Sequence, residues 1–390
     1  MNRVTSMLIF CVAVLLGLGM ITLYSSSMNM ELSRSTVGSD FLRSQMIWGA
    51  FGLMGCAIAA AIPYRKWKPL APWAFGFSIL LLILVFVPHI GWAATAGRAA
   101  GGASGAHRWI APPFLPHFQP SELAKLAMII FLAAYADRYQ RQMGTFTRGL
   151  LIPGAIIGVM LLLVFVEPDR GCTMLLAAVA AVMFVVAGAR MLFLIPAGLA
   201  GVGALAWSLS HDTMRTGRIY AWLHPELTKD GAGYQAWQAM IAFGSGGLWG
   251  VGLGDSRQKL GFIPEHHTDF IFAIVGEELG LVTTLTVVLI FAALIICGLC
   301  IARRAPDTFG RLMATGITFM IAIQAFINMG VATNLLPCKG MPLPFISYGG
   351  SNLLLMLVCV GLLLNIAKSA AAPAVLSSNP FDSSRKLTDE

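Results

Sequence analysis

Ten long runs of apolar residues constrain the fold of this chain more than any other feature of its sequence. Each approaches the roughly 20 residues that an α-helix needs to cross a bilayer, and none alternates with the period of a transmembrane β-strand. With 57% hydrophobic and 11% charged residues, the chain is expected to be an all-α integral membrane protein with about ten transmembrane helices. The runs lie near residues 5–25, 44–63, 71–92, 121–136, 149–166, 172–188, 191–209, 269–302, 312–333 and 350–368.

Two of the runs differ from the rest, and the first run also resembles a targeting signal. The fourth is short and begins with the polar Gln119-Pro-Ser-Glu122, and the eighth is long enough to tilt or to project beyond the bilayer. The first run is too long for a signal peptide and lacks a small-residue cleavage site, so we expect an uncleaved first span.

Lysine and arginine are concentrated in alternate short loops, and this asymmetry predicts the orientation in the membrane. It places both termini in the cytoplasm and the long loop at about residues 210–268 outside it. The formal net charge of +8 therefore reflects topology, with attraction to anionic lipids as a second effect, and we expect no nucleic-acid partner. The basic loops contain Arg65, Lys66, Lys68, Arg138, Arg141, Arg148, Arg190, Arg303, Arg304 and Arg311.

The sequence predicts a single membrane domain over residues 1–369 and a disordered cytoplasmic tail over residues 370–390, which are rich in Ala, Ser and Pro. Within the long extracytoplasmic loop, residues 231–254 are apolar but broken by glycines. Such backbone survives at membrane depth only where protein or a water-filled cavity covers it. We therefore expect a re-entrant or interfacial helix near Tyr234–Phe243, followed by a glycine-rich turn.

A cluster of ionisable residues around Asp269 is the main candidate for a functional site, because such groups are costly to place at a membrane boundary. With Thr268, Asp269 could cap the helix that follows, or it could serve as a general base held ionised beside a low-dielectric cleft. The residues alone leave both interpretations open. The cluster comprises Arg257, Lys259, Glu265, His266, His267 and Asp269.

Two neighbouring features of this cluster favour structural roles. The adjacent His266 and His267 are poorly spaced to converge on one metal ion, and no third ligand is clearly spaced near them. Glu277 and Glu278 lie farther along the helix, and we expect them to pair with cations inside the bundle.

The seven cysteines are an odd number lying mostly in apolar runs, so packing is the favoured interpretation, including for Cys297-x-x-Cys300.

Other polar groups are expected on the same extracytoplasmic side. Lys125 falls one turn inside an apolar helix that begins near Ser121 and Glu122, so it requires an anionic partner. Arg108 and Trp109 could belong to the site or act as interface anchors.

Three further loops complete the expected polar face. Glu167-Pro-Asp-Arg170 could be a site element or a simple polar hairpin. Arg215 and Arg218 suit phosphate oxygens, and Gln235 follows them. The last loop, Lys339 to Ser351, is apolar and rich in proline and glycine, as expected for backbone folded into a cavity, and it contains Ser347.

These segments together resemble the SEDS family (shape, elongation, division and sporulation). The resemblance extends from the first span through the tenth, and Ser256-Arg-Gln-Lys259 with Pro337-Cys-Lys-Gly340 are most similar to the division branch. The matching segments are His107-Arg-Trp-Ile110, Phe118-Gln-Pro-Ser-Glu-Leu-Ala-Lys125, Gly233-Tyr-Gln235, Gly244-Ser-Gly-Gly-Leu248, Ser256-Arg-Gln-Lys-Leu260, Pro264-Glu-His-His-Thr-Asp-Phe-Ile-Phe272, Glu277-Glu-Leu-Gly280 and Pro342-Leu-Pro-Phe-Ile-Ser-Tyr-Gly-Gly350.

The resemblance implies a peptidoglycan glycosyltransferase that polymerises lipid II at the inner membrane, at the division septum. It implies a class B penicillin-binding protein (an FtsI-like transpeptidase) and other divisome membrane proteins as partners. The essential aspartate of the family falls on Asp269, and undecaprenyl diphosphate would be the leaving group. No cofactor is clearly implied, and assistance by Mg²⁺ or Mn²⁺ stays open. The expected substrate-binding residues are Lys125, Arg108, Trp109, Glu122, Arg215, Arg218, Gln235, Lys259, Glu265, His267, Thr268, Lys339 and Ser347.

Departures from the family pattern and rival functions limit this expectation. Glu167-Pro-Asp-Arg-Gly-Cys172 replaces the usual Gln-Pro-Asp-Phe-Gly-Thr, Cys338 replaces a threonine, and His107 replaces an arginine, so ligand roles for Glu167, Arg170 and Cys338 are not implied. A lipid II flippase also fits charged groups in a bundle, although a flippase needs polar residues on both faces and at the midplane. A non-catalytic division scaffold and a sporulation paralogue also stay open.

Overall fold

All ten expected spans are helices. The computed structural model describes residues 3–33, 37–87, 91–92, 109–110, 118–211, 213–263 and 267–371. Nine helices in this part of the chain are long and apolar enough to cross a membrane, and the remaining expected span, α4, contains several ionisable residues. The ten helices are α1 (Arg3–Ser33), α2 (Val37–Ala61), α3 (Trp67–Leu84), α4 (Pro120–Arg138), α5 (Ile152–Val166), α6 (Arg170–Ala187), α7 (Met191–Ser210), α10 (Ile271–Arg304), α11 (Thr308–Ala332) and α12 (Gly350–Ala371).

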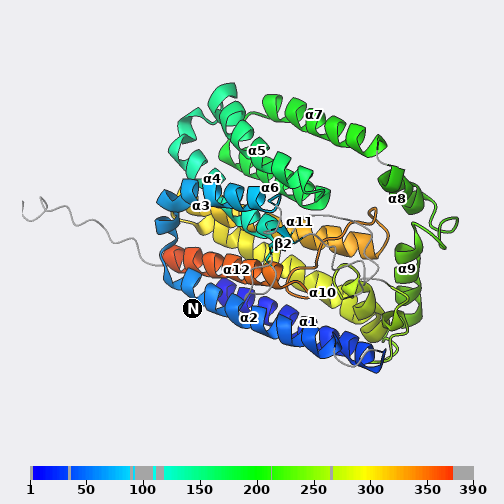
Figure 1. Cartoon of the computed structure of the whole chain (residues 1–390). Helices are drawn as coiled ribbons and strands as arrows, with labels where there is room; N and C mark the ends of the chain where they lie inside the picture. Colours follow the sequence, from blue (N-terminus) through cyan, green and yellow to red (C-terminus); the bar gives the residue numbers. More distant parts are fainter. Residues whose placement is uncertain are drawn as a thin grey trace, which may run out of the picture.

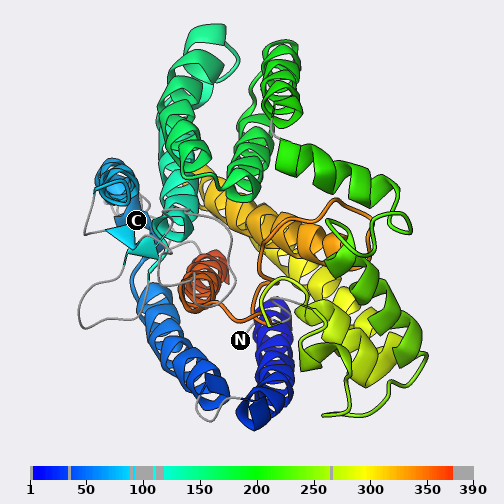
Figure 2. The same ribbon diagram turned by 45° about the vertical axis from the view of Figure 1, so that its right-hand side comes forward.

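The helices form one bundle in which α4, α11 and α12 are the most enclosed. α12 packs along α2 and also contacts α4, α10 and α11, and Figure 2 shows it near the middle of the bundle. α7 has no buried residue and stands apart from the central helices (Figure 1). The N-terminus and the end of α12 lie at the same end of the bundle in Figure 1. This is the arrangement that an even number of spans produces. Of the expected tail, residues 372–390 lie outside the described residues.

A short antiparallel ribbon, which we did not predict, precedes α4. β1 (Gly91–Trp92) pairs with β2 (Trp109–Ile110), with Gly91 opposite Ile110 and Trp92 opposite Trp109. Ile110 in turn exchanges backbone hydrogen bonds with Phe118 at 2.9 and 3.0 Å. This second pairing places Trp109 beside the N-terminal end of α4.

The long loop contains more regular structure than expected. The predicted helix near Tyr234–Phe243 is confirmed as α9 (Tyr234–Gly246), which packs on α10 and α11. Its depth in the membrane stays a prediction. The loop also contains α8 (Thr213–Leu223) and the short η5 (Gln258–Leu260). Three other short turns lie toward the other end of the bundle, namely η1 (Tyr64–Lys66), η3 (Gln140–Gln142) and η4 (Thr147–Leu151).

The unusual length of the eighth span has a specific cause, which is a break in α10 at Gly280. Gly280 has φ 75° and ψ −175°, a conformation open to glycine but strained for other residues. The glycine-rich turn after α9 fills the break, because Leu281 N–H donates to the Gly247 carbonyl at 2.9 Å and Val251 N–H donates to the Glu277 carbonyl at 2.9 Å. Two helical segments therefore share one span, joined through the turn.

We expect Gly280→Ala to destabilise the protein by at least about 2 kcal/mol, since it combines a positive φ with overpacking. An added Cβ would lie 2.5 Å from the Leu248 carbonyl oxygen and would also meet Gly250 N. Thermal unfolding in detergent measures the change. Gly76→Ala in α3 is the matched control, because a Cβ at that position meets nothing within 4 Å; equal unfolding temperatures for the two variants would contradict the prediction.

Candidate active site

A cavity of about 700 Å³ opens among α2, α4, α6, α11, α12, the residues just before α10 and the loop between α11 and α12. Five residues predicted for the site line it, namely Trp109, Glu122, Lys125, Thr268 and Asp269. They come from segments more than 140 residues apart in the chain, so the bundle assembles the site. The cavity is therefore the candidate location of the expected chemistry.

Asp269 stands one residue before the N-cap of α10, which is Phe270, so the N-cap interpretation of Asp269 is wrong. Asn328 of α11 fixes the backbone there, because its Nδ2 donates to the Asp269 carbonyl at 2.9 Å and to the Met341 carbonyl at 2.7 Å. The Asp269 carboxylate lies against Gly340, where an added Cβ would be 2.7 Å from Oδ2. The partly buried carboxylate is thus held at the cavity wall by α11 and by the loop.

Ser347 and its neighbours fasten the α11–α12 loop to the residues just before Asp269. The Ser347 hydroxyl donates to the Thr268 carbonyl at 2.6 Å and accepts from Leu343 N–H at 2.7 Å. Tyr348 N–H donates to the His267 carbonyl at 3.0 Å. Ser347 is buried and does not line the cavity, so the structure places it as a support of the backbone around the carboxylate.

The close approach of Gly340 to Asp269 gives a direct prediction. In Gly340→Ala the carboxylate must move away from the new Cβ, and a displacement of about 1 Å at a reacting group can reduce turnover about 100-fold. We expect a loss of glycosyl transfer of about tenfold or more, with little change in unfolding temperature. Gly231→Ala, in the loop between α8 and α9, is the control, because the nearest atom to an added Cβ is at 4.0 Å. Full activity in Gly340→Ala would show that the position of Oδ2 does not matter.

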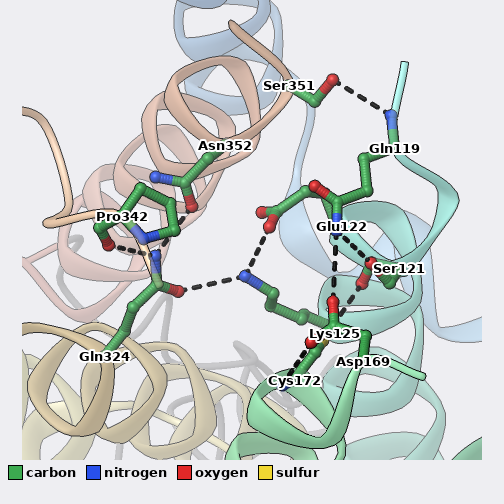
Figure 3. A network of polar contacts seen from close by, with 10 residues as sticks. All are labelled: Gln119, Ser121, Glu122, Lys125, Asp169, Cys172, Gln324, Pro342, Ser351 and Asn352. Atoms are coloured by element: carbon green, nitrogen blue, oxygen red, sulfur yellow. Dashed lines mark hydrogen bonds and ion pairs between the residues drawn. The ribbon is translucent and has the colours of Figure 1, made fainter. Parts of the chain in front are cut away.

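Lys125 lies in a network of hydrogen bonds in the wall of the cavity (Figure 3). Its Nζ donates to Glu122 Oε1 at 2.8 Å and to Gln324 Oε1 at 3.0 Å. Gln324 in turn donates from Nε2 to the Pro342 carbonyl and to Asn352 Oδ1, both at 2.9 Å. The expected anionic partner of Lys125 is therefore Glu122, and the pair is tied to α11, α12 and the loop.

Asp169 adds a second carboxylate to this wall. It caps α6 by accepting from Cys172 N–H at 3.1 Å, and it accepts from Gln119 Nε2 at 3.3 Å. Both interpretations of the 167–170 hairpin thus have support, since Asp169 is a helix cap that also lines the cavity. Among the described lining residues, Lys125 is the one cation, and three carboxylates share the cavity with it, those of Glu122, Asp169 and Asp269.

His267 packs beside the cavity without lining it. Its ring lies 4.8 Å from that of Phe41 and 5.8 Å from that of Tyr348. Burial lowers the pKa of His267 from 6.5 to about 4, because the charged form loses hydration. The imidazole is therefore neutral at physiological pH.

This shift predicts a dependence of stability on pH. Between pH 6.5 and pH 4 the unfolded chain binds a proton at His267 that the folded protein does not, so stability falls as the pH falls through this window. We expect His267→Asn to lose less stability than wild type over the same range. Unfolding temperatures at a series of pH values measure this, and parallel curves for the two proteins would refute the shift.

Lys259 is not brought to the cavity. It forms an ion pair with Glu278 at 2.9 Å in which both side chains have no exposed surface, and its Nζ also donates to Ser25 Oγ at 3.1 Å. The expected pairing of Glu278 with a cation is confirmed. Glu277 instead accepts from the Ser256 hydroxyl and from the backbone N–H groups of Arg257 and Gln258, so the expectation of a cation partner for Glu277 was wrong. These contacts hold the 256–260 segment on α10.

Three other expected residues lie around Cys338, next to Gly340. Cys338 Sγ lies 3.7 Å from Gln235 Oε1, and Lys339 Nζ contacts the Met174 sulfur of α6. The Arg218 guanidinium of α8 lowers the pKa of the Cys338 thiol. None of them lines the cavity. Arg108, Glu265 and the side chain of Arg215 lie outside the described residues.

Several residues of the site were missed from the sequence. Gln324, Asn328 and Asn352 are buried amides in the otherwise apolar α11 and α12, and a polar side chain inside a span is a signal that could have identified them. In the part of the chain that the structure describes, no group of three His, Cys, Asp or Glu side chains is placed to hold a metal ion.

Comparisons with known proteins agree with this architecture. The profile of a family described as "Cell cycle protein" (FtsW, RodA and SpoVE) matches residues 5–372. The chain is similar to a "Probable peptidoglycan glycosyltransferase FtsW" of Trichlorobacter lovleyi, with 38% identity over 360 residues, 92% of each chain. It is 39% identical to a protein of the same name from Geobacter sulfurreducens (90% of this chain, 91% of the relative). It is also 36% identical to the "Stage V sporulation protein E" of Bacillus subtilis (93% and 96%).

Solved structures share the fold at lower sequence identity. A chain described under "Structural coordination of polymerization and crosslinking by a peptidoglycan synthase complex" is similar with a TM-score of 0.72 and 25% identity, covering 94% of this chain and 98% of that one. The rod shape determining protein RodA of Thermus thermophilus is similar with a TM-score of 0.66 and 25% identity, covering 93% and 96%. The similarity covers nearly the whole bundle in both cases.

Proposed function

The chain belongs to the FtsW/RodA/SpoVE family of cell cycle proteins, and from this premise we propose that it is a peptidoglycan glycosyltransferase of the FtsW type. The protein spans a membrane with many helices, and the relatives that it matches over nine-tenths of its length carry that activity in their names. The substrate is lipid II, a disaccharide peptide linked through a diphosphate to undecaprenol. The product is a glycan strand.

Asp269 is the general base of the proposed reaction. The GlcNAc 4-hydroxyl of the acceptor lipid II gives its proton to the Asp269 carboxylate as its oxygen bonds to the anomeric carbon of the donor strand. The bond from that carbon to the diphosphate oxygen breaks, and the electron pair leaves with undecaprenyl diphosphate. Attack from the side opposite the leaving group inverts the anomeric centre.

One observation carries the proposal, namely that the Asp269 carboxylate shares a 700 Å³ cavity with a hydrogen-bonded Glu122–Lys125 pair. A sugar is uncharged and rich in hydroxyl groups, so it suits a wall that offers both donors and acceptors. Trp109 gives this wall an aromatic surface, and Gln324 and Asn352 add amides. The prenyl chains would stay in the bilayer beside the bundle.

The setting of the reaction is part of the same proposal. The protein would lie in the inner membrane at the division septum, with both termini in the cytoplasm and the cavity on the outer face. A class B penicillin-binding protein would join it and crosslink the strands that it makes. The related synthase complex, which is described as coordinating polymerisation with crosslinking, supports such a partner.

Purified protein incubated with labelled lipid II, with and without its penicillin-binding partner, tests the function. We expect glycan strands of many disaccharides, resolved by gel electrophoresis, in at least the complex. Proteoliposomes loaded with fluorescent lipid II separate the rival activity in the same preparation. Movement of lipid II across the bilayer without glycan products would overturn the proposal in favour of a flippase.

A further inference from the structure

The charges around the cavity are divided in a way that locates the diphosphate of the donor. Resting on the proposed function, we propose that the leaving undecaprenyl diphosphate binds outside the cavity, at a cationic rim formed by Arg170, Arg218 and Lys339. Lys125 would then contact the sugar alone. This assignment differs from the expectation that Lys125 is the main cation for the diphosphate.

The cavity itself is unsuited to a diphosphate. Its described lining carries three carboxylates and one ammonium group, and that ammonium already donates to Glu122 and Gln324. A buried pair of opposite charges presents no net charge to a ligand. The remaining carboxylates, Asp169 and Asp269, would repel the phosphate oxygens in a low-dielectric site.

The cationic rim adjoins the cavity lining in the chain, because Lys339 directly precedes the lining residue Gly340 and does not itself line the cavity. Three helices, α6, α8 and α9, contact residues 333–340. Trp222 Nε1 of α8 donates to the Asn334 carbonyl at 3.0 Å, α9 reaches Cys338 through Gln235, and α6 contacts Lys339 through Met174. Arg170 begins α6, where it donates to the Ser208 carbonyl of α7 at 3.4 Å.

The charges of the rim act on one another and on the site. Burial raises the pKa of Cys338 to about 11, with the Arg218 guanidinium lowering it and the Asp269 carboxylate raising it. Burial lowers the pKa of Lys339. The nearby Arg170 guanidinium lowers this pKa further, whereas the Asp169 carboxylate raises it. Arg218 and Asp269 are therefore both close enough to influence Cys338. Because Gly340 lies against the Asp269 carboxylate, the rim and the general base both adjoin residues 338–340.

Two of the rim cations, Arg218 and Lys339, are available to an anion. Among the ion pairs of the described residues, neither Arg218 nor Lys339 is neutralised by a carboxylate. Arg218 is exposed and Lys339 is partly exposed, so neither has to be uncovered. Guanidinium groups bind phosphate oxygens through paired hydrogen bonds, and cations at this position would stabilise the charge that develops as the bond to the diphosphate breaks.

The position of the rim near Asp269 indicates which of the two lipid substrates, donor or acceptor, has its diphosphate bound there. The donor's diphosphate is attached to the carbon that the acceptor hydroxyl attacks, so it lies close to the general base but on the other side of that carbon. The acceptor's own diphosphate lies beyond two sugar rings. The rim therefore holds the donor's diphosphate.

Binding of undecaprenyl diphosphate in detergent, followed by intrinsic tryptophan fluorescence, tests the rim without requiring catalysis. We expect Arg218→Gln and Lys339→Gln each to raise the Kd about tenfold, as loss of one charge-assisted hydrogen bond predicts. Lys229→Gln, an exposed cation on the same side, and the paired cavity variant Glu122→Gln/Lys125→Gln should stay within about twofold of wild type. Unchanged binding in the rim variants, with loss in the paired variant, would overturn the assignment.

A second arm separates donor from acceptor. Lipid II methylated at the 4-hydroxyl can only donate, so the KM for donor and acceptor can be measured separately in the complex. We expect the rim variants to raise the KM for this donor and to leave that for the acceptor unchanged; the reverse pattern would assign the rim to the acceptor. If wild type makes no glycan, the proposed function fails, while the binding measurement still decides whether the rim holds a diphosphate.

Discussion

Replacing Asp269 by asparagine is expected to reduce glycan synthesis by about 100- to 10,000-fold, the usual contribution of a general base. The amide keeps the size and shape of the side chain but cannot take the proton of the acceptor hydroxyl. Its backbone carbonyl would still accept from Asn328, so the local fold should persist. Initial rates of lipid II polymerisation by the purified complex measure the loss.

The interpretation of this variant depends on showing that it is folded. We expect Asp269→Asn to keep the wild-type unfolding temperature and to bind undecaprenyl diphosphate at least as tightly as wild type, because the rim cations remain and a carboxylate that repels phosphate is removed. If the Asp269→Asn protein keeps both properties and polymerises lipid II at a near-normal rate, Asp269 is not the general base. Loss of folding would instead make the variant uninformative, and Asp269→Glu would then serve as a second probe of the position of the base.

Replacing Lys125 by glutamine is expected to be the most destabilising change at the site. Glu122 and Lys125 are both almost fully buried, with side-chain exposures of 5% and 4%. Removing one partner of a buried ion pair typically costs about 3–5 kcal/mol, because the other charge stays buried without compensation. We expect a large fall in unfolding temperature together with loss of activity.

The paired variant Glu122→Gln/Lys125→Gln separates the two effects. With no charge left uncompensated, it should recover most of the stability that Lys125→Gln loses. It should not recover polymerisation, because the donors and acceptors for the sugar have changed. If the paired variant were as unstable as Lys125→Gln, the cost would lie in packing, and if it polymerised normally the pair would have no role in sugar binding.

Much of the bundle follows from hydropathy, since every run of about 20 apolar residues became a helix. The same rule that located the spans, that ionisable groups are expensive near lipid, also selected Asp269, Lys125 and Glu122. These residues come from distant segments, and the structure brings them together in one cavity. The predicted helix after residue 233 was found for a related reason, because apolar sequence interrupted by glycines cannot form a straight span.

What the sequence did not reveal depends on contacts between distant backbones. The break of α10 at Gly280 needs the turn at Gly247–Val251 to supply its hydrogen bonds, and no local pattern shows that pairing. Lys259 was expected to bind substrate because it lies near Asp269 in the chain. Its buried partner Glu278 is 19 residues later, and one helical turn decides whether such a lysine faces a cavity or a carboxylate.

Transfer of a single disaccharide tests the central claim most directly, that Asp269 takes the proton of the acceptor hydroxyl in this cavity. The 4-O-methyl donor is mixed with an excess of acceptor lipid II and the complex, and the first tetrasaccharide lipid is followed over time by mass spectrometry. We predict that wild type forms it within the first turnover and that Asp269→Asn, with both lipids bound, forms it at least about 100-fold more slowly. Formation of the tetrasaccharide lipid by Asp269→Asn at the wild-type rate would contradict the account.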